Sequence, residues 1–417
     1  MTPTRSHESA AGAAGRFSNV TWAILSLVIA VLYFPFSIGY GGAAIYLLAG
    51  DCMLRGEPLA SCSLGYSYPP LLALFMIPLS LLPAWAANLV WYALLVASTY
   101  GCFWICELLV IRAFELTRRE LFWVRLITVI LSLKFVLAVF SNQAFDVLVL
   151  FFMLVGLYGL SESRTLLGAI GLATAAALKA TPLLMLFYPL LLRKWRLFAL
   201  GAGLCALLSF LPDLLFPPND PGAGYLRTWL VEFAVGGLFG TRAAEGYAIF
   251  FQGSPELNHS LKALVYRVMD PRNLLWKDLS MSAHVTLYIV YTVYCLMALA
   301  IVLRAATMQG AYLWGGAVVL ISMLLLSPIT SKSHLVVLLL PHMVIVAYLL
   351  KHREAWMPAL PLLCATFVLY VLSSRWPMGR ALSEKATSLG SITIAMLLLL
   401  AVVAVIVFRR RRGPEPA

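Results

Sequence analysis

The chain has 417 residues, of which 62% are hydrophobic and only 12% are charged, with a mean hydropathy of +0.91. A soluble protein has about a quarter of its residues charged, so this composition excludes a soluble globular fold. The net charge of +12 comes from short basic clusters between apolar segments. We interpret these clusters as topology determinants that face the cytoplasm and anionic membrane lipids, and we expect no nucleic-acid partner.

The apolar segments run without polar alternation, which favours membrane helices over a β-barrel. Several are shorter than the ~20 residues that a full crossing needs. We therefore predict an all-α, polytopic integral membrane protein with about 12 transmembrane helices, in which one of the segments 69–83, 166–178 or 182–192 does not cross completely. The expected segments are 19–38, 69–83, 86–111, 124–141, 145–160, 166–178, 182–192, 197–216, 283–303, 311–326, 335–350, 357–373 and 388–408.

The basic clusters also predict the orientation of the chain. Residues 1–18 are expected to form a cytoplasmic tail, 19–408 the transmembrane domain and 409–417 a basic cytoplasmic tail. Three polar segments then lie outside: a first outer loop (39–68), a large outer loop (217–282) and an outer hinge (327–334). Because these segments share one face and the sequence has no two related halves, we expect a membrane-embedded site that opens outward rather than a transporter.

The first outer loop contains an amphipathic stretch whose spacing predicts a juxtamembrane helix along the membrane surface, ended by Gly56. Asp51 on this helix has three interpretations: a solvated partner of Arg55 at i+4, a catalytic base, or a substrate-binding residue. Cys52 and Cys62 share the loop and would be able to form a disulfide in an oxidising compartment.

Other charged residues stand beside apolar segments. Asp146 begins one, where an acid is costly unless it is used or paired. Lys179 interrupts another and either binds substrate or snorkels. In the hinge, Lys332 and His334 precede a helix whose free amides favour an anion, although an interfacial turn is the alternative. The sequence contains no acidic pair with metal-ligand spacing, so we expect no metal and no cofactor.

Several motifs occur in a defined order. A juxtamembrane helix with Tyr46 is followed by Tyr68-Pro-Pro-Leu71 and Leu81-Leu-Pro83. The later motifs are Gln143, Leu178-Lys179-Ala-Thr-Pro182, Arg193-Lys-Trp-Arg196, Asn258-His-Ser-Leu261 with Arg267, and Leu326-Ser-Pro-Ile329 with His334. Over roughly residues 20–350 this order resembles glycosyltransferase family 87, the polyprenol-phosphate-mannose-type enzymes of the GT-C superfamily.

The resemblance implies a GT-C-like fold and an inverting transfer of a hexose, with mannose as the expected sugar. The implied donor is a polyprenyl-phosphate sugar and the implied acceptor a lipid or glycan, at the outer face of a bacterial plasma membrane. Such a transfer needs a base for the acceptor hydroxyl and donors for the departing phosphate. The candidates are Asp51 and Asp146 as catalytic residues, His334, Lys332, Arg267 and Lys179 for the donor phosphate, and Tyr46, Tyr68, Gln143 and Asn258 for substrate binding.

The sequence departs from the family at the expected base. The family's Asp, four residues before the Tyr, is replaced by Gly42, which cannot accept a proton. Asp51 would lie about 13 Å further along a helix axis and on nearly the opposite side, so it is no simple replacement. This departure leaves open a catalytically impaired relative that binds or moves lipid-linked sugars, with a polytopic transporter as a further alternative.

Overall fold

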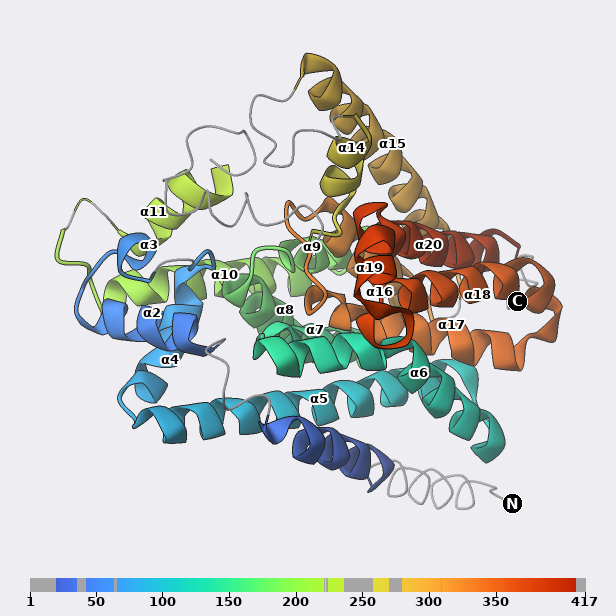
Figure 1. Cartoon of the computed structure of the whole chain (residues 1–417), viewed down its shortest axis with the longest axis horizontal. Coiled ribbons are helices and arrows are strands. Elements are labelled where there is room, and N and C mark those ends of the chain that lie inside the picture. Colours follow the sequence, from blue (N-terminus) through green and yellow to red (C-terminus); the bar gives the residue numbers. More distant parts are fainter. Residues whose placement is uncertain are drawn as a thin grey trace.

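The computed structural model describes residues 20–35, 43–63, 66–220, 222, 224–235, 258–269, 280–308 and 310–409 (Figure 1). The expected tail 1–18, nearly all of the basic tail 409–417, Gly42 and much of the large outer loop lie outside these ranges. Within them every regular element is a helix. The elements are the helix Val20–Pro35, α2 Ala44–Leu54, α3 Leu59–Cys62, α4 Pro70–Ser80, α5 Ala84–Phe114, α6 Arg118–Asn142, α7 Asp146–Ser161, α8 Thr165–Leu178, α9 Leu183–Leu191, α10 Trp195–Leu215, α11 Tyr225–Thr228, η2 Trp229–Val235, α14 Leu261–Met269, α15 Met281–Ala305, α16 Ala311–Leu326, η4 His334–Leu338, α17 Leu339–Lys351, η5 Arg353–Ala355, α18 Trp356–Leu372, α19 Arg375–Ser388 and α20 Ser391–Arg409.

Each expected membrane segment forms a helix, because only internal hydrogen bonds satisfy the backbone in hydrocarbon. Within the described ranges, six helices are long and apolar enough to cross a membrane, or seven if α18 and α19 count as one bent span. They are α5, α6, α10, α15, η4 with α17, and α20. The protein is therefore a multi-pass membrane protein. The other apolar helices are shorter than a full crossing needs, so the expected count of about 12 crossings is not confirmed. With nine residues, α9 reaches only about 13 Å.

Among the helices that were not expected from the sequence, α19 is the longest. α19 follows α18 at an angle of 88° and occupies a stretch that the sequence analysis left between two membrane segments. Its composition is polar, so it lacks the apolar run that marks a membrane helix. After this sharp bend, Arg375 at the start of α19 lines the same groove as Lys332 of the hinge.

α7 and α8 form a tightly packed hairpin. A side-chain carbon at Gly171 would lie 2.5 Å from the backbone nitrogen of Gly156, and Gly159 faces Gly168 in the same way. These pairs run antiparallel, so the backbones of the two helices are in direct contact, as is typical of small residues between membrane helices. The start of α7 and the end of α8 consequently lie at the same end of the hairpin.

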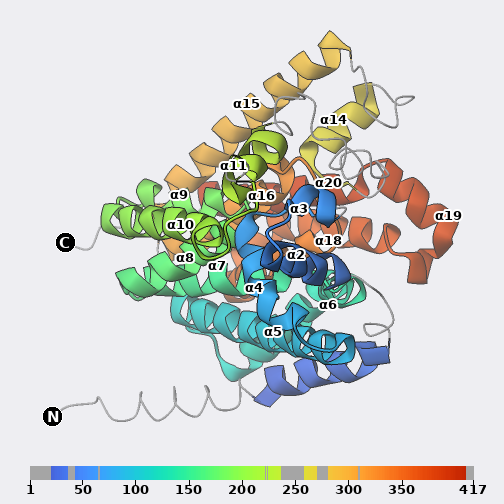
Figure 2. The same cartoon turned by 90° about the vertical axis from the view of Figure 1, so that its left-hand side faces the viewer.

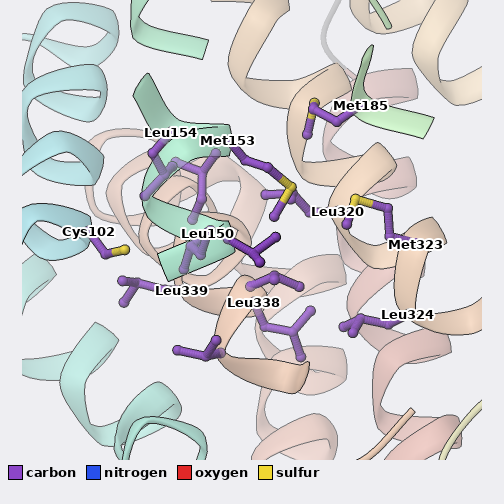
Figure 3. Packing of buried hydrophobic residues seen from close by; sticks show 14 of the residues in the cluster. Cys102, Leu150, Met153, Leu154, Met185, Leu320, Met323, Leu324, Leu338 and Leu339 are labelled. Carbon is purple, nitrogen blue, oxygen red and sulfur yellow. The ribbon is translucent and has the colours of Figure 1, made fainter. Parts of the chain in front are cut away.

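The core lies around α7. In Figure 3, Leu150, Met153 and Leu154 of α7 meet side chains of α16 and of the η4–α17 segment. All of the labelled side chains are buried. This packing holds α7 inside the helix bundle and so fixes the position of its first residue.

Polar connecting segments gather at one end of the molecule. Figure 1 shows α2, α3 and α11 at the end opposite to the C-terminal end of α20, and Figure 2 shows them together in front of the bundle. Asn219 joins the segment after α10 to the first loop. Its backbone amide donates a hydrogen bond to Gly56 O and its side-chain Nδ2 donates one to Arg55 O, both at 2.9 Å. The indole of Trp229 donates to Ser67 O at 3.1 Å.

Candidate functional site

A buried ion cluster lies at the paired ends of α7 and α8. Asp146, the first residue of α7, is only 5% exposed, and its Oδ1 lies 2.5 Å from Lys179 Nζ. Lys179 directly follows α8 in extended conformation. His334 Nε2 lies 3.8 Å from the same carboxylate oxygen. The hairpin therefore brings together a carboxylate and an ammonium group that are 33 residues apart in the sequence. This contact agrees with the expectation that Asp146 is used or paired.

The state of the His334 ring follows from its neighbours. Its Nδ1 accepts a hydrogen bond from the Ser331 amide at 3.3 Å. A neutral imidazole then carries its proton on Nε2, which is the nitrogen that faces Asp146. Between Asp146, Lys179, His334 and Thr330 lies a cavity of about 20 Å³, which has room for one water molecule or one hydroxyl group.

Aromatic rings enclose the cluster on the side of the first loop. Tyr68 and Phe145 pack edge to face with centroids 4.7 Å apart, and Tyr46 packs against both. Lys179 Nζ lies 5.6 Å from the centroid of Phe145 and 6.0 Å from that of Tyr68, within reach of a cation–π interaction. Desolvation, together with the charge of Asp146, raises the pKa of Tyr68 to about 12, so its hydroxyl stays protonated and can donate. Both predicted tyrosines therefore border the ion cluster.

Gln143 positions the elements around the cluster. It ends α6 in the left-handed conformation, with φ 48°. Its Oε1 accepts from the Ala43 amide at 2.9 Å, and its carbonyl accepts from the Trp91 indole at 3.0 Å. The side chain thus holds the start of α2 against the junction between α6 and α7.

Asn258 fixes the hinge. Its Oδ1 accepts from the amides of Ser260 (3.1 Å) and Thr330 (2.9 Å), and its Nδ2 donates to Pro328 O at 2.9 Å. The amide of His259 also donates to Thr330 O at 2.7 Å. Two motifs that are about 70 residues apart therefore dock onto each other, and their contact holds the segment that leads to His334.

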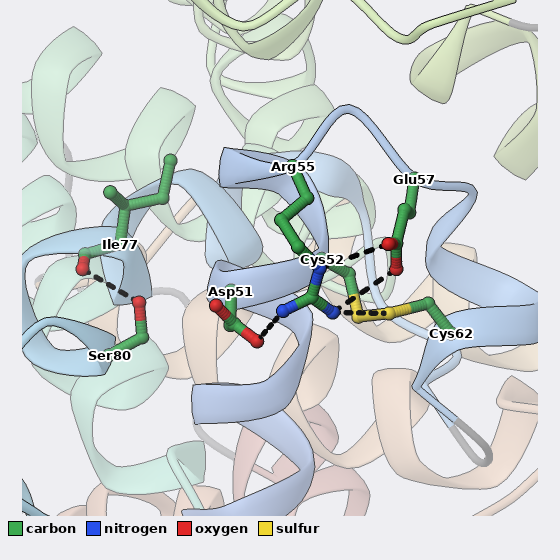
Figure 4. Close-up of polar contacts among 7 residues, drawn as sticks. All are labelled: Asp51, Cys52, Arg55, Glu57, Cys62, Ile77 and Ser80. Carbon is green, nitrogen blue, oxygen red and sulfur yellow. Dashed lines mark hydrogen bonds and ion pairs between the residues drawn. A yellow bond between two sulfur atoms is a disulfide. The ribbon is translucent and has the colours of Figure 1, made fainter.

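Asp51 lies apart from this cluster. Figure 4 shows its carboxylate paired with Arg55, which also binds Glu57 through hydrogen bonds of 3.0 and 3.1 Å. The hydrogen bonds from Arg55 lower the pKa of the Glu57 carboxyl. Asp51 is partly exposed and does not line the cavity beside Asp146. The structure thus contains the i+4 pair with Arg55 that was one of the three interpretations of Asp51.

Cys52 and Cys62 form a disulfide that joins α2 to the end of α3 (Figure 4). The structure therefore contains the disulfide that the sequence allowed in this loop. Disulfides persist in oxidising compartments. The bond also occupies the two thiols that, with Glu57, come close enough together to hold a metal ion.

The four predicted phosphate ligands are divided between locations. Lys179 and His334 are in the ion cluster, whereas Lys332 lines a separate groove beside α6. Arg267 is half-buried on α14. The burial of Lys332 lowers its pKa, and the charge of Arg375 acts in the same direction.

Three further residues were missed by the sequence analysis. His259 is completely buried and neither of its ring nitrogens has a hydrogen-bond partner in the described structure. Burial lowers its pKa well below the ordinary value, and the charges of Lys332 and Arg267 add to this effect. Lys134 and Arg375 line the groove with Lys332. The sequence offered one signal for Lys134, because this charged residue interrupts the apolar segment 124–141.

Comparison with known proteins gives the family. The sequence model of glycosyltransferase family 87 matches residues 66–328, which is more than half of the chain. The chain belongs to glycosyltransferase family 87. Membership supports a membrane glycosyltransferase with a donor and an acceptor substrate. Neither the curated proteins nor the solved structures that were compared contain a match.

The family match covers the ion pair but not the whole site. Asp146, Lys179 and Asn258 lie within the matched residues, whereas α2 and His334 lie outside them. The resemblance that the sequence analysis traced over roughly 20–350 is thus supported over a shorter range. Gly42, where the family's Asp is missing, lies outside the described residues.

Proposed function

We propose that this family 87 protein transfers a hexose, with mannose as the expected sugar, from a polyprenyl-phosphate donor to a lipid or glycan acceptor. The proposed setting is the outer face of a bacterial plasma membrane, with a GT-C-type fold and the segments 39–68, 217–282 and 327–334 outside. The observation that carries the proposal is the buried cluster of Asp146, Lys179 and His334 beside the hinge. An ionised acid with two nitrogen partners at a membrane-helix terminus is costly to bury and is typically functional.

In the proposed reaction Asp146 is the base. Its carboxylate removes the proton from the acceptor hydroxyl, whose oxygen attacks the anomeric carbon of the sugar. The bond from that carbon to the phosphate oxygen breaks with inversion, and the polyprenyl phosphate leaves with the electron pair. Asp146 is preferred to Asp51 because Asp51 is exposed and paired with Arg55.

The other residues of the cluster supply charge and hydrogen bonds. His334 carries its proton on Nε2 and donates to the departing phosphate oxygen. Lys179 forms an ion pair with Asp146 in the absence of substrate. When the donor is bound, its ammonium group also interacts with the negatively charged phosphate. Tyr46 and Tyr68 form the wall against which the sugar lies, while Gln143 and Asn258 hold the surrounding elements in place.

Transfer from radiolabelled polyprenyl-phosphate hexoses to a membrane lipid extract by the purified protein tests this proposal. We expect His334→Ala to lower the rate at least about tenfold, because a lost hydrogen bond to a charged group costs about 1.5–3 kcal/mol. His352→Ala is the matched control, since His352 follows α17 at its other end and pairs with Glu354. If His334→Ala transfers sugar at the wild-type rate, His334 does not bind the departing phosphate. If the wild-type protein binds the donor but transfers no sugar, the chain is the impaired relative that the loss of the family's Asp suggests.

A further inference from the structure

α19 is an exposed helix at the edge of the bundle. Figure 2 shows it beside α18 and α20, on the side of these helices that faces away from α10. Gly379 departs from helical geometry within it, with φ 73°. Glu384 bridges this break, because its carboxylate accepts from Arg375 at 2.9 Å and from Arg380 at 3.0 Å. α19 is therefore a folded element with a defined shape.

The two faces of α19 are reversed relative to a helix in water. Ser383 and Thr387 face the protein and are only 2% and 4% exposed. The opposite face of the helix carries Leu382, Lys385 and Leu389, and the two leucines are 47% and 67% exposed. A helix surrounded by water buries its apolar face and exposes its polar face. The reversed pattern indicates that the outer face of α19 lies against apolar material.

Trp376 enlarges this exposed apolar surface. It belongs to the first turn of α19 and is 98% exposed. Exposed apolar patches of this kind mark sites of interaction with proteins or membranes. Tryptophan in particular is enriched where a membrane meets water, because its ring is apolar and its N–H can donate a hydrogen bond.

The bend between α18 and α19 is held by hydrogen bonds. Lys134 of α6 donates from Nζ to the carbonyl of Tyr370 at 2.9 Å and to the hydroxyl of Ser373 at 2.6 Å. The hydroxyl of Ser374 donates to the same carbonyl at 2.8 Å. The last carbonyls of a helix need donors from outside the helix, and a cation there also interacts favourably with the helix dipole. These contacts end α18 at this point and fix the position where α19 begins.

The course of α18 sets the orientation of α19 in the membrane. α18 begins beside the basic cluster 351–353, and its 17 residues extend about 25 Å, most of the thickness of the hydrocarbon core. Its exposed side chains include Leu360 and Val368, which are apolar as expected for contact with lipid. α19 meets α18 at 88° and therefore lies close to the plane of the membrane. Its level is the membrane surface at the end of α18 that is remote from the basic cluster.

The charges of α19 match a phospholipid surface. The helix has three cations and one acid, and its cations Arg380 and Lys385 are exposed. Long cationic side chains extend along apolar surface and place their charge at the level of lipid headgroups. A symmetric dimer built on this face would bring the same cations of two copies together. The phospholipid surface is therefore the occupant that complements both the apolar and the charged residues.

We propose that α19 is an interfacial helix that binds the phospholipid surface of the membrane on the side of the hinge. Trp376, Leu382 and Leu389 enter the boundary between headgroups and acyl chains. Arg380 and Lys385 interact with the phosphate groups of the surrounding headgroups. This role is independent of the sugar transfer proposed above, so the two can be tested separately.

Depth-dependent fluorescence quenching in phospholipid nanodiscs tests this placement. A fluorescent maleimide is attached to Leu382→Cys in the full-length protein, with the exposed Cys295 and Cys364 changed to serine. We expect a lipid nitroxide near the glycerol backbone to quench this label at least about twofold more strongly than a nitroxide at the end of the acyl chain. A label on the native Cys364, in the middle of α18, is the control for the hydrocarbon core and should show the reverse order. A label at Asp220→Cys is the control for water and should be quenched mainly by iodide.

Two results for the label at position 382 would overturn the proposal. Quenching mainly by iodide places α19 in water. Quenching by neither nitroxide nor by iodide places it beneath another protein chain, such as a second copy.

The headgroup contacts are tested by changing Arg380 and Lys385 to glutamine together. Both side chains are exposed, so the double variant leaves the core unchanged. In nanodiscs that contain phosphatidylglycerol, we expect iodide quenching of the label at position 382 to rise at least about threefold, because cations are attracted to an anionic surface. Lys194→Gln, which removes an exposed cation beside α10, is the matched control and should leave the quenching unchanged. Equal iodide quenching in the double variant and in wild type would contradict the contacts with headgroups.

Discussion

At the scale of single residues, the stability of the site depends on the pairing of Asp146 with Lys179. The sequence indicated that Asp146 needed a partner or a use, and that Lys179 either binds substrate or snorkels. It did not indicate that they meet, since the contact arises from the packing of a whole hairpin. Breaking a buried pair by removing one partner leaves an uncompensated charge and costs about 3–5 kcal/mol.

A double variant separates this structural role from catalysis. We expect Asp146→Asn alone to lower the unfolding temperature in detergent, and Asp146→Asn with Lys179→Met to recover more than half of the loss. Methionine has a similar length and no charge, so it leaves no unpaired ammonium group. If both proteins unfold at the wild-type temperature, the pair contributes nothing to the fold and our account of its burial is wrong.

At the scale of elements, the α7–α8 hairpin places the ion pair. The close approach of its backbones depends on glycine, because a side chain at Gly171 would meet the backbone of Gly156. Overpacking of this kind costs about 1–3 kcal/mol and forces the helices apart. Separation of the helices would also separate Asp146 from Lys179.

We therefore expect Gly171→Leu to lower both the unfolding temperature and the rate of sugar transfer. Gly203→Leu on α10 is the matched control, since a β-carbon there meets no atom within 4 Å. Thermal unfolding and transfer by the two leucine variants under the same conditions provide the comparison. Equal behaviour of the two would show that backbone contact between α7 and α8 is dispensable.

The elements also show what the sequence could and could not predict. Uninterrupted apolar runs predicted the membrane helices, because a helix satisfies the hydrogen bonds of the backbone within the segment when lipid surrounds it. α19 was missed because its polar composition carries no such signal, and its 88° bend from α18 depends on packing. The groove was missed with it, since Arg375 lies on α19 and the role of Lys134 depends on α18. The ring of aromatic residues around Lys179 likewise requires α2 and α7 to be adjacent, which no spacing in the sequence reveals.

At the scale of the whole molecule, hydrogen bonds join the polar segments in pairs. Asn219 links the segment after α10 to the first loop, and Asn258 links the segment before α14 to the hinge. Lys194 lies at the other end of α10, whose 21 residues extend about 31 Å, the thickness of the hydrocarbon core. One helix therefore separates a basic end from the end that carries the site.

Cysteine labelling on both sides of α10 tests this orientation. In a background with the exposed Cys295 and Cys364 changed to serine, we expect Asp220→Cys to react with an impermeant maleimide in intact spheroplasts. Lys194→Cys should react only after lysis, because basic ends stay in the cytoplasm. The reverse pattern would place the ion cluster on the cytoplasmic side and contradict an outward-facing site.

The central claim is that Asp146, and not Asp51, is the base of a sugar transfer. The most direct test measures the initial rate of hexose transfer from polyprenyl phosphate by wild type, Asp51→Asn and Asp146→Asn, with the folded fraction of each protein determined in parallel. Because a positioned base contributes about 10²–10⁴-fold to the rate, we predict that Asp146→Asn loses at least about 100-fold per folded molecule. Asp51→Asn should stay within about twofold of wild type, since its exposed pair with Arg55 lies outside the cavity. A wild-type rate in Asp146→Asn, or a loss confined to Asp51→Asn, would contradict the account.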